Sequence, residues 1–192
     1  MTAGSLSTKD TVSAKVDEQR RRRIMSNHSA CHLLQLALRQ VLGNHVHQAG
    51  SYYDEHRCRF DFSHFSAMTS EEIAKVQHLV NQMILSANPV QVEELPIEQA
   101  KNKGAMALFG EKYGDVVRVC TMGESVEFCG GTHVPNTAQI GVFKIISESS
   151  VAAGVRRIEA ATGMGVLELL DNAEQVIGAV ASELKAAGQA EV

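Results

Sequence analysis

Residues 20–43 read RRRRIMSNHSACHLLQLALRQVLG, and the rest of the fold is best understood around this stretch. It has no glycine or proline between Ile24 and Leu42, and Gly43 follows, so it predicts one helix that ends at a glycine cap. Its apolar residues cover much of the helix circumference: Leu33, Leu34, Leu36, Ala37, Leu38, Val41 and Leu42. A helix that is apolar nearly all round is typically buried, so we expect it at the centre of the molecule.

A predicted hairpin follows this helix. Residues 45–53 and 57–62 have the character of strands, and in the second of them charged residues alternate with Cys58, Phe60 and Phe62. Alternation with a period of two is typical of a strand that is buried on one face. We therefore expect these three side chains in the core.

The segments after the hairpin mix helices and strands. Thr69 and Glu72 form a capping-box pattern at the start of a second helix, and Asn88–Pro89 ends that helix. A short helix is predicted from Pro96 to Gly104. Further strands are predicted over residues 90–95, 116–122, 141–147 and 155–160. This order contains few strand–helix–strand units, so it favours an α+β fold.

The pattern changes after residue 162 to that of an amphipathic helix. Apolar residues recur at heptad spacing: Val166, Leu170, Ala173, Ile177, Val180 and Leu184. We therefore divide the chain into a flexible N-terminal segment at 1–14, a main domain at 15–162 and a C-terminal helix at 163–192. A lone helix would expose this seam to water, so either its own domain or a second chain must cover it, and we favour self-association through residues 166–184.

The composition is that of a globular protein. Hydrophobic residues make up 44% of the 192 residues and charged residues 21%, which excludes wholesale disorder. No apolar run approaches the roughly 18 residues of a membrane span. The net charge of −4 gives no general attraction for nucleic acid, so any binding of nucleic acid would need a local basic patch. With four cysteines and no apolar secretion signal, we expect a reduced, cytoplasmic chain in which cysteine binds metal or does chemistry.

Two pairs of metal-ligating residue types stand out. His28 and His32 are four positions apart, so they project from one helix face with Cβ atoms roughly 6 Å apart. Cys129 and His133 flank a Gly-Gly-Thr turn, in which the glycines let the backbone bring both side chains to one point. Three histidines and a cysteine suit a tetrahedral zinc ion, and we expect one zinc per chain.

The spacing alone does not decide what this zinc does. The first histidine has no neighbouring glutamate, so the pattern is not that of the His-Glu-x-x-His metalloproteases. The two pairs are too far apart in the chain for a small zinc finger. A structural zinc site has four protein ligands and no position for water or substrate, whereas a catalytic site keeps one such position. The spacing does not show which kind of site this is.

Five segments, in the same order, resemble the editing domain of alanyl-tRNA synthetases. They are His28-Ser-Ala-Cys-His32-Leu-Leu, Arg59-Phe-Asp-Phe-Ser63-His64, Gly104-Ala-Met-Ala-Leu-Phe-Gly-Glu-Lys-Tyr113, Cys129-Gly-Gly-Thr-His133 and Ala153-Gly-Val-Arg-Arg-Ile-Glu159. The resemblance covers residues 15–162. It implies the α+β fold of threonyl- and alanyl-tRNA synthetase editing domains, with a mixed or antiparallel sheet around a central helix. It also implies zinc held by the two residue pairs described above.

The function implied by the resemblance is hydrolysis of tRNA(Ala) wrongly loaded with serine or glycine. An alanine pocket rejects glycine weakly, because one methyl group is worth only about 1–3 kcal/mol, and a second hydrolytic site is the remedy. The block at 104–113 looks like the form embedded in a bacterial-type synthetase, whose ATP-dependent aminoacylation core would lie outside this sequence. The alternatives are a freestanding trans-editing deacylase and a tRNA-binding module with purely structural zinc.

The resemblance also marks candidates for substrate contact. Gln48 matches a family glutamine near the editing pocket, and Thr132, inside the metal turn, either contacts substrate or only closes the turn. Cys31 stands where the family motif commonly has threonine, whose hydroxyl would hydrogen-bond a serine side chain. Arg156 and Arg157 are candidates for contact with the tRNA backbone, which demands positive charge.

Overall fold

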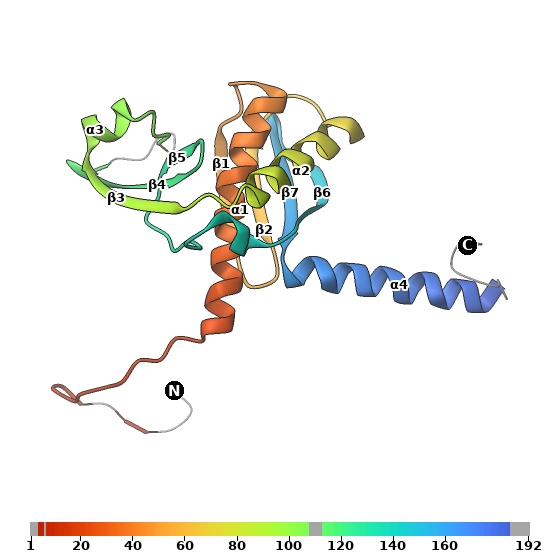
Figure 1. Ribbon diagram of the computed structural model, residues 1–192, viewed down its shortest axis with the longest axis horizontal. Helices are drawn as coiled ribbons and strands as arrows, with labels where there is room; N and C mark the ends of the chain where they lie inside the picture. Colours follow the sequence, from red (N-terminus) through yellow and green to blue (C-terminus); the bar gives the residue numbers. More distant parts are fainter. Residues whose placement is uncertain (1–3, 6, 108–112, 185–192) are drawn as a thin grey trace.

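The computed structural model describes residues 4–5, 7–107 and 113–184. Helix α1 (Glu18–Leu42) runs through the middle of the molecule, as Figure 1 shows. The Asp17 side chain caps its N-terminus by accepting from the backbone N–H of Arg20, and Gly43 closes its C-terminus at a φ of 114°. Its inward residues are buried almost completely, so the predicted central helix is confirmed.

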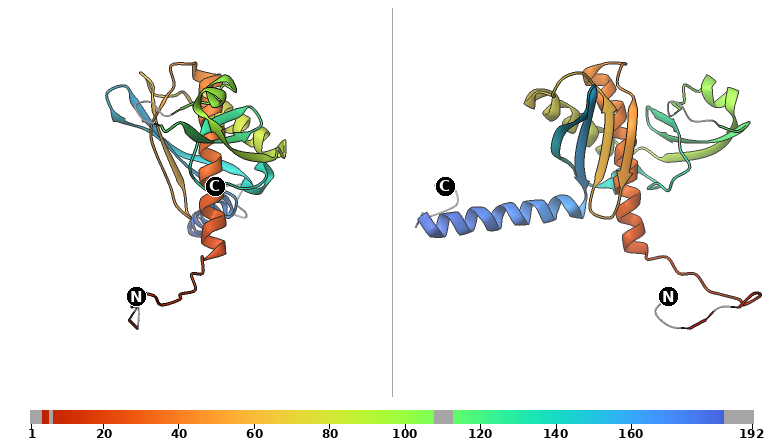
Figure 2. Two further views of the ribbon diagram at one scale, coloured as in Figure 1. Left: turned by 90° about the vertical axis from the view of Figure 1, so that its left-hand side faces the viewer. Right: turned by 180° about the vertical axis from the view of Figure 1, so that it is seen from behind.

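A four-stranded antiparallel sheet lies against α1, in the order β1 (Gln48–Tyr53), β2 (Cys58–Ser63), β7 (Val155–Thr162) and β6 (Phe143–Ala152). Figure 2 shows this sheet from behind. In β2, Cys58, Phe60 and Phe62 are buried, as the alternation predicts. Helix α2 (Ser70–Leu85) packs against α1 and β6, and its predicted capping box between Thr69 and Glu72 is present.

A second antiparallel sheet lies on the other side of α1 and carries the short helix α3 (Ile97–Asn102). Its order is β3 (Val90–Pro96), β4 (Val116–Met122) and β5 (Ser125–Phe128). It has a small core of its own. Strand β5, which the sequence analysis did not predict, contacts α1, so the turn that follows β5 lies beside that helix. A 3₁₀ helix, η1 (Thr137–Ile140), then leads towards β6.

Helix α4 (Met164–Leu184) projects away from the two sheets (Figures 1 and 2). An ion pair of 3.1 Å between Arg23 and Glu168 ties its base to α1. Most of its apolar seam is exposed, with Leu170 55% and Leu184 66% accessible. The predicted part of this helix beyond residue 184 and residues 108–112 of the 104–113 block lie outside the described residues.

The predicted α+β class with a C-terminal helix is confirmed. All strand pairs in the two described sheets are antiparallel, and the strands are divided between two sheets that flank α1. No helix among the described residues is long and apolar enough to span a membrane.

Candidate metal centre and its cavity

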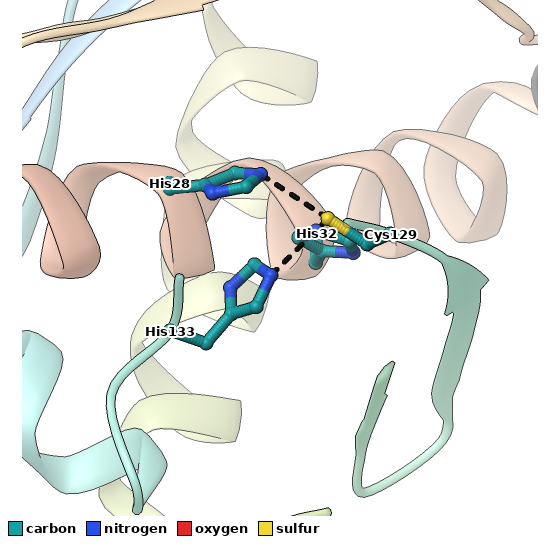
Figure 3. Close-up of side chains that lie close together, drawn as sticks. All are labelled: His28, His32, Cys129 and His133. Atoms are coloured by element: carbon teal, nitrogen blue, oxygen red, sulfur yellow. Dashed lines mark hydrogen bonds between the residues drawn. The ribbon is translucent and has the colours of Figure 1, made fainter. Parts of the chain in front are cut away.

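The four predicted metal ligands converge on one point. His28 and His32 extend from α1, whereas Cys129 and His133 come from the turn after β5 (Figure 3). One ligand atom from each residue lies within 4.8 Å of the others. The Cys129 Sγ atom is 3.5 Å from His28 Nε2 and 3.2 Å from His133 Nε2. The sequence pairs that are far apart in the chain therefore form one cluster.

The geometry of this cluster fits a zinc ion. Zinc bonds of about 2.0–2.3 Å in a tetrahedron place neighbouring ligand atoms about 3.3–3.8 Å apart. One sulfur–nitrogen distance, 3.5 Å, lies inside this range, and the other, 3.2 Å, lies just below it. Three imidazoles and one thiolate are also the donor set that zinc prefers. The residues present can hold the metal that the sequence predicts.

Charge within the cluster already favours the ligand form of the cysteine. Burial alone would raise the pKa of Cys129, but hydrogen bonds from His133, His28 and His32 lower this pKa to about 3. Burial alone would lower the pKa of His32, but the carboxylate of Glu127 and the Cys129 sulfur raise this pKa to about 10. A thiolate is the form of cysteine that binds metal, whereas His32 has to release its proton to bind one.

Two neighbouring groups orient the histidine rings. His32 Nδ1 lies 2.9 Å from Glu127 Oε2, an ion-pair distance without the geometry of a hydrogen bond. His133 Nδ1 lies 3.2 Å from Ser29 Oγ, which also accepts from the N–H of Val134. Such partners on Nδ1 leave Nε2 to face the metal. Ser29 and Glu127 were not predicted from the sequence, although Ser29 lies between the two helix ligands and Glu127 just before the metal turn.

The metal turn is held in place from both sides. Arg118 on β4 donates from Nη1 to Cys129 O at 2.6 Å and to Gly131 O at 2.7 Å. The ring of His28 lies so close to Gly131 that an added Cβ would be 2.1 Å from His28 Cε1. His28 also stacks on Tyr53 with a centroid distance of 3.8 Å. The chain therefore needs glycine at position 131 to admit the ring.

A cavity of about 450 Å³ adjoins the metal ligands. Gln48 lines it from β1, half-buried and hydrogen-bonded to Ser51 Oγ at 3.2 Å. Cys31 lines it from α1, and its hydrogen bond with Cys58, together with burial, raises the pKa of the Cys31 thiol well above its usual value. Thr132 is exposed and is not among the described residues that line this cavity. The cavity thus brings two of the three predicted substrate contacts to the ligands.

The two candidate tRNA-binding arginines lie on β7, in the other sheet. Arg156 forms a two-pronged ion pair with Glu148, and Arg157 donates to both carboxylate oxygens of Asp61 at 2.7 and 2.8 Å. Both arginines are thus paired with carboxylates of the same sheet. Their contact with tRNA remains a prediction.

Comparisons with known proteins show which family this chain resembles. A family described as "Threonyl and Alanyl tRNA synthetase second additional domain" matches residues 117–159, which contain the metal turn. The chain is 54% identical over 186 residues to the alanine–tRNA ligase of Pelotomaculum thermopropionicum, and 55% identical over 186 residues to alanine–tRNA ligase 1 of Lachnoclostridium phytofermentans. It is homologous to one segment of the alanine–tRNA ligases. The alignments cover 96% of this chain but only 21% of each relative.

A third relative shows the same relationship at slightly lower identity. The alanine–tRNA ligase of Bacillus velezensis is 50% identical over 184 residues, which is 95% of this chain and 21% of that protein. The chain therefore spans about a fifth of the length of the curated relatives that it matches.

Proposed function

We propose that this chain hydrolyses the ester of tRNA(Ala) that carries serine or glycine, at a zinc ion held by His28, His32, Cys129 and His133. The observation that supports this proposal most strongly is the position of these ligands at a cavity of about 450 Å³. Binding cavities of roughly 300–1,000 Å³ accept small ligands, and the aminoacyl end of a tRNA is of that kind. We propose residues 15–162 as the unit that carries this activity.

The roles of the protein groups follow from their chemistry. When bound, zinc supplies Lewis-acid polarisation of an ester carbonyl. Gln48 presents an amide to the cavity, which can both donate and accept hydrogen bonds to orient the aminoacyl group or a water molecule. Cys31 is held as a neutral thiol, which is a poor nucleophile, so we assign it to substrate contact rather than to a covalent intermediate.

In the matched relatives, the segment similar to this chain is part of a longer protein, and the proposal extends to such a protein. Because the chain spans 21% of the matched relatives, we propose that ligation of alanine to tRNA(Ala) with ATP belongs to residues outside this sequence. The tRNA(Ala) acceptor end is the proposed partner, and the cytoplasm the proposed location. A freestanding trans-editing protein is less well supported, since the matched relatives are ligases.

One observation favours a second candidate function. The four side chains would complete a tetrahedral zinc shell, which is typical of structural zinc. In that case the domain would bind tRNA without hydrolysing its ester.

Deacylation of three substrates by the zinc-loaded chain separates these functions. We expect rapid loss of serine and glycine from tRNA(Ala), slow loss of alanine, and loss of activity in Cys129→Ala, which removes the thiolate ligand. A chain that binds one zinc and binds tRNA(Ala), yet releases serine no faster than alanine, would overturn the hydrolytic proposal in favour of a binding module.

A further inference from the structure

Arg118 has hydrogen-bond donors that the metal turn does not use. Its Nη1 donates to Cys129 O and Gly131 O, which accounts for both hydrogens on that nitrogen. A guanidinium has five N–H donors, so three remain on Nε and Nη2. No hydrogen bond or ion pair joins these two nitrogens to any residue in the described part of the chain.

The edge of Arg118 formed by Nε and Nη2 is the one that binds anions elsewhere in this protein. Arg157 uses Nε and Nη2 to bind the two carboxylate oxygens of Asp61, and Arg156 binds Glu148 in the same way. The spacing of these donors matches two oxygens of a carboxylate or of a phosphate. In Arg118, none of the residues that the structure describes occupies this edge.

The position of Arg118 indicates which anion it would bind. Its side chain lines the cavity beside the metal ligands. Glu94 lies directly opposite on β3, but within the described residues the two form no ion pair. Glu127, the carboxylate among the described lining residues, lies 2.9 Å from His32. Arg118 therefore brings a positive charge to the cavity that no described carboxylate neutralises at ion-pair distance.

We propose that Arg118 binds a phosphate of the polynucleotide end while its Nη1 holds the metal turn. This inference rests on the proposed function. The aminoacyl group has a cationic ammonium, which Arg118 would repel, whereas the terminal adenosine of a tRNA carries a 5′ phosphate. One side chain thus connects the position of the terminal nucleotide with the position of Cys129.

Binding of adenosine 5′-monophosphate and adenosine to the zinc-loaded chain tests this without catalysis. We expect the wild type to bind the monophosphate about tenfold more tightly, equivalent to about 1.4 kcal/mol, and Arg118→Gln to bind both equally. The matched control is Arg39→Gln. Arg39 also donates from Nη1 to two backbone carbonyls, Asn44 O at 3.0 Å and Val46 O at 2.8 Å, but it does not line the cavity. Equal preference for the monophosphate in wild type and Arg118→Gln would overturn the inference.

A pair of esters separates phosphate binding from support of the turn. With seryl-tRNA(Ala), Arg118→Gln should raise KM about tenfold and change kcat little. The reason is that the phosphate contact stabilises the bound substrate and the transition state equally. With 3′-O-seryl adenosine, which has no phosphate, the variant should show only the loss that comes from its missing turn contacts, so its kcat/KM should fall about tenfold less than with the tRNA ester. Equal losses on both esters together with loss of zinc would show that Arg118 only supports the turn.

These experiments distinguish failure of the inference from failure of the proposed function. A wild type that hydrolyses neither ester but prefers the monophosphate through Arg118 would contradict the hydrolytic function and support phosphate binding. A wild type that hydrolyses both esters, with no effect of Arg118→Gln on either KM or monophosphate binding, would contradict the inference alone.

Discussion

Gly131 leaves the space that the His28 ring occupies. A Cβ at this position would lie 2.1 Å from His28 Cε1 and 2.7 Å from Nδ1, and Tyr53 stacks on the same ring with centroids 3.8 Å apart, which limits how far the ring can move. A glycine in the metal turn therefore has a reason beyond backbone freedom. It determines where one ligand of the cluster can be.

We predict that Gly131→Ala weakens zinc binding by at least about tenfold, the range seen when groups that orient ligands are lost. Competition with a chromogenic chelator measures this affinity. Gly130→Ala is the matched control, because an added Cβ at Gly130 meets nothing within 4 Å. Equal zinc affinity in the two variants would show that the His28 ring is not held against the turn.

Cys31 is the residue through which we expect selectivity to be tuned. It lines the cavity as a buried thiol, one residue before the ligand His32. A thiol is a weaker hydrogen-bond partner for a serine hydroxyl than a threonine hydroxyl is. A site that bonds a substrate hydroxyl discriminates strongly against the analogue that lacks it.

We therefore predict that Cys31→Thr retains zinc and raises the ratio of Ser-tRNA(Ala) to Ala-tRNA(Ala) hydrolysis. Deacylation rates with both substrates, together with metal analysis, measure the effect. An unchanged or lower ratio in a variant with full zinc content would show that position 31 does not recognise the hydroxyl.

Among the strands, β2 and β4 were predictable from the sequence, and β5 was not. Strand β4 has the predicted bounds Val116–Met122, and β2 buries the predicted face. Strand β5 is only four residues long, Ser125–Phe128, and it is stabilised by pairing with β4 and by contact with α1. Neither interaction leaves a periodic signal in so short a segment.

The site, too, has residues that a local sequence pattern identifies and residues that only tertiary contacts identify. The cluster of candidate metal ligands was predictable because histidine and cysteine are typical ligand residues and each pair has a short spacing in the chain. Glu127 and Arg118 act through tertiary proximity, as a carboxylate 2.9 Å from His32 and a donor to two turn carbonyls. Nothing in the local sequence shows which distant groups they meet.

The arginines of β7 give a prediction about the larger sheet. The side chain of Glu148 is 6% exposed and that of Asp61 is 13% exposed, so both depend on Arg156 and Arg157 for compensation. We predict that Arg156→Gln with Arg157→Gln lowers the Tm and the rate of deacylation together, because two poorly solvated carboxylates lose their partners.

Thermal melts followed by circular dichroism provide the measurement. Adding Glu148→Gln and Asp61→Asn to the double variant is the matched control and should recover part of the lost Tm, since no unpaired charge remains. A double variant with the wild-type Tm but weak, salt-sensitive binding of tRNA would instead assign these arginines to the tRNA backbone.

At the scale of the whole molecule, α4 presents an apolar face without cover from the described part of the chain. Leu170, Ile177 and Leu184 of the predicted seam are 55%, 39% and 66% exposed. A soluble helix normally buries such a stripe against another surface.

We predict that the chain self-associates through residues 166–184. Light scattering should show a mass above that of one 20.8 kDa chain, and Leu170→Glu with Ile177→Glu should reduce it to the monomer value. Val176 is exposed but is not part of the predicted seam. Val176→Glu therefore serves as a control that adds a negative charge to α4 without changing the seam. A monomeric wild type would contradict the prediction.

The central claim is that one zinc ion joins the helix pair of ligands to the turn pair. Zinc X-ray absorption on the chain purified without chelators tests this claim most directly, because it reports the number and type of ligand atoms. The account predicts one zinc per chain with one sulfur at about 2.3 Å and three nitrogens at about 2.0–2.1 Å. Protein without bound metal, or a zinc shell that contains no sulfur, would contradict it.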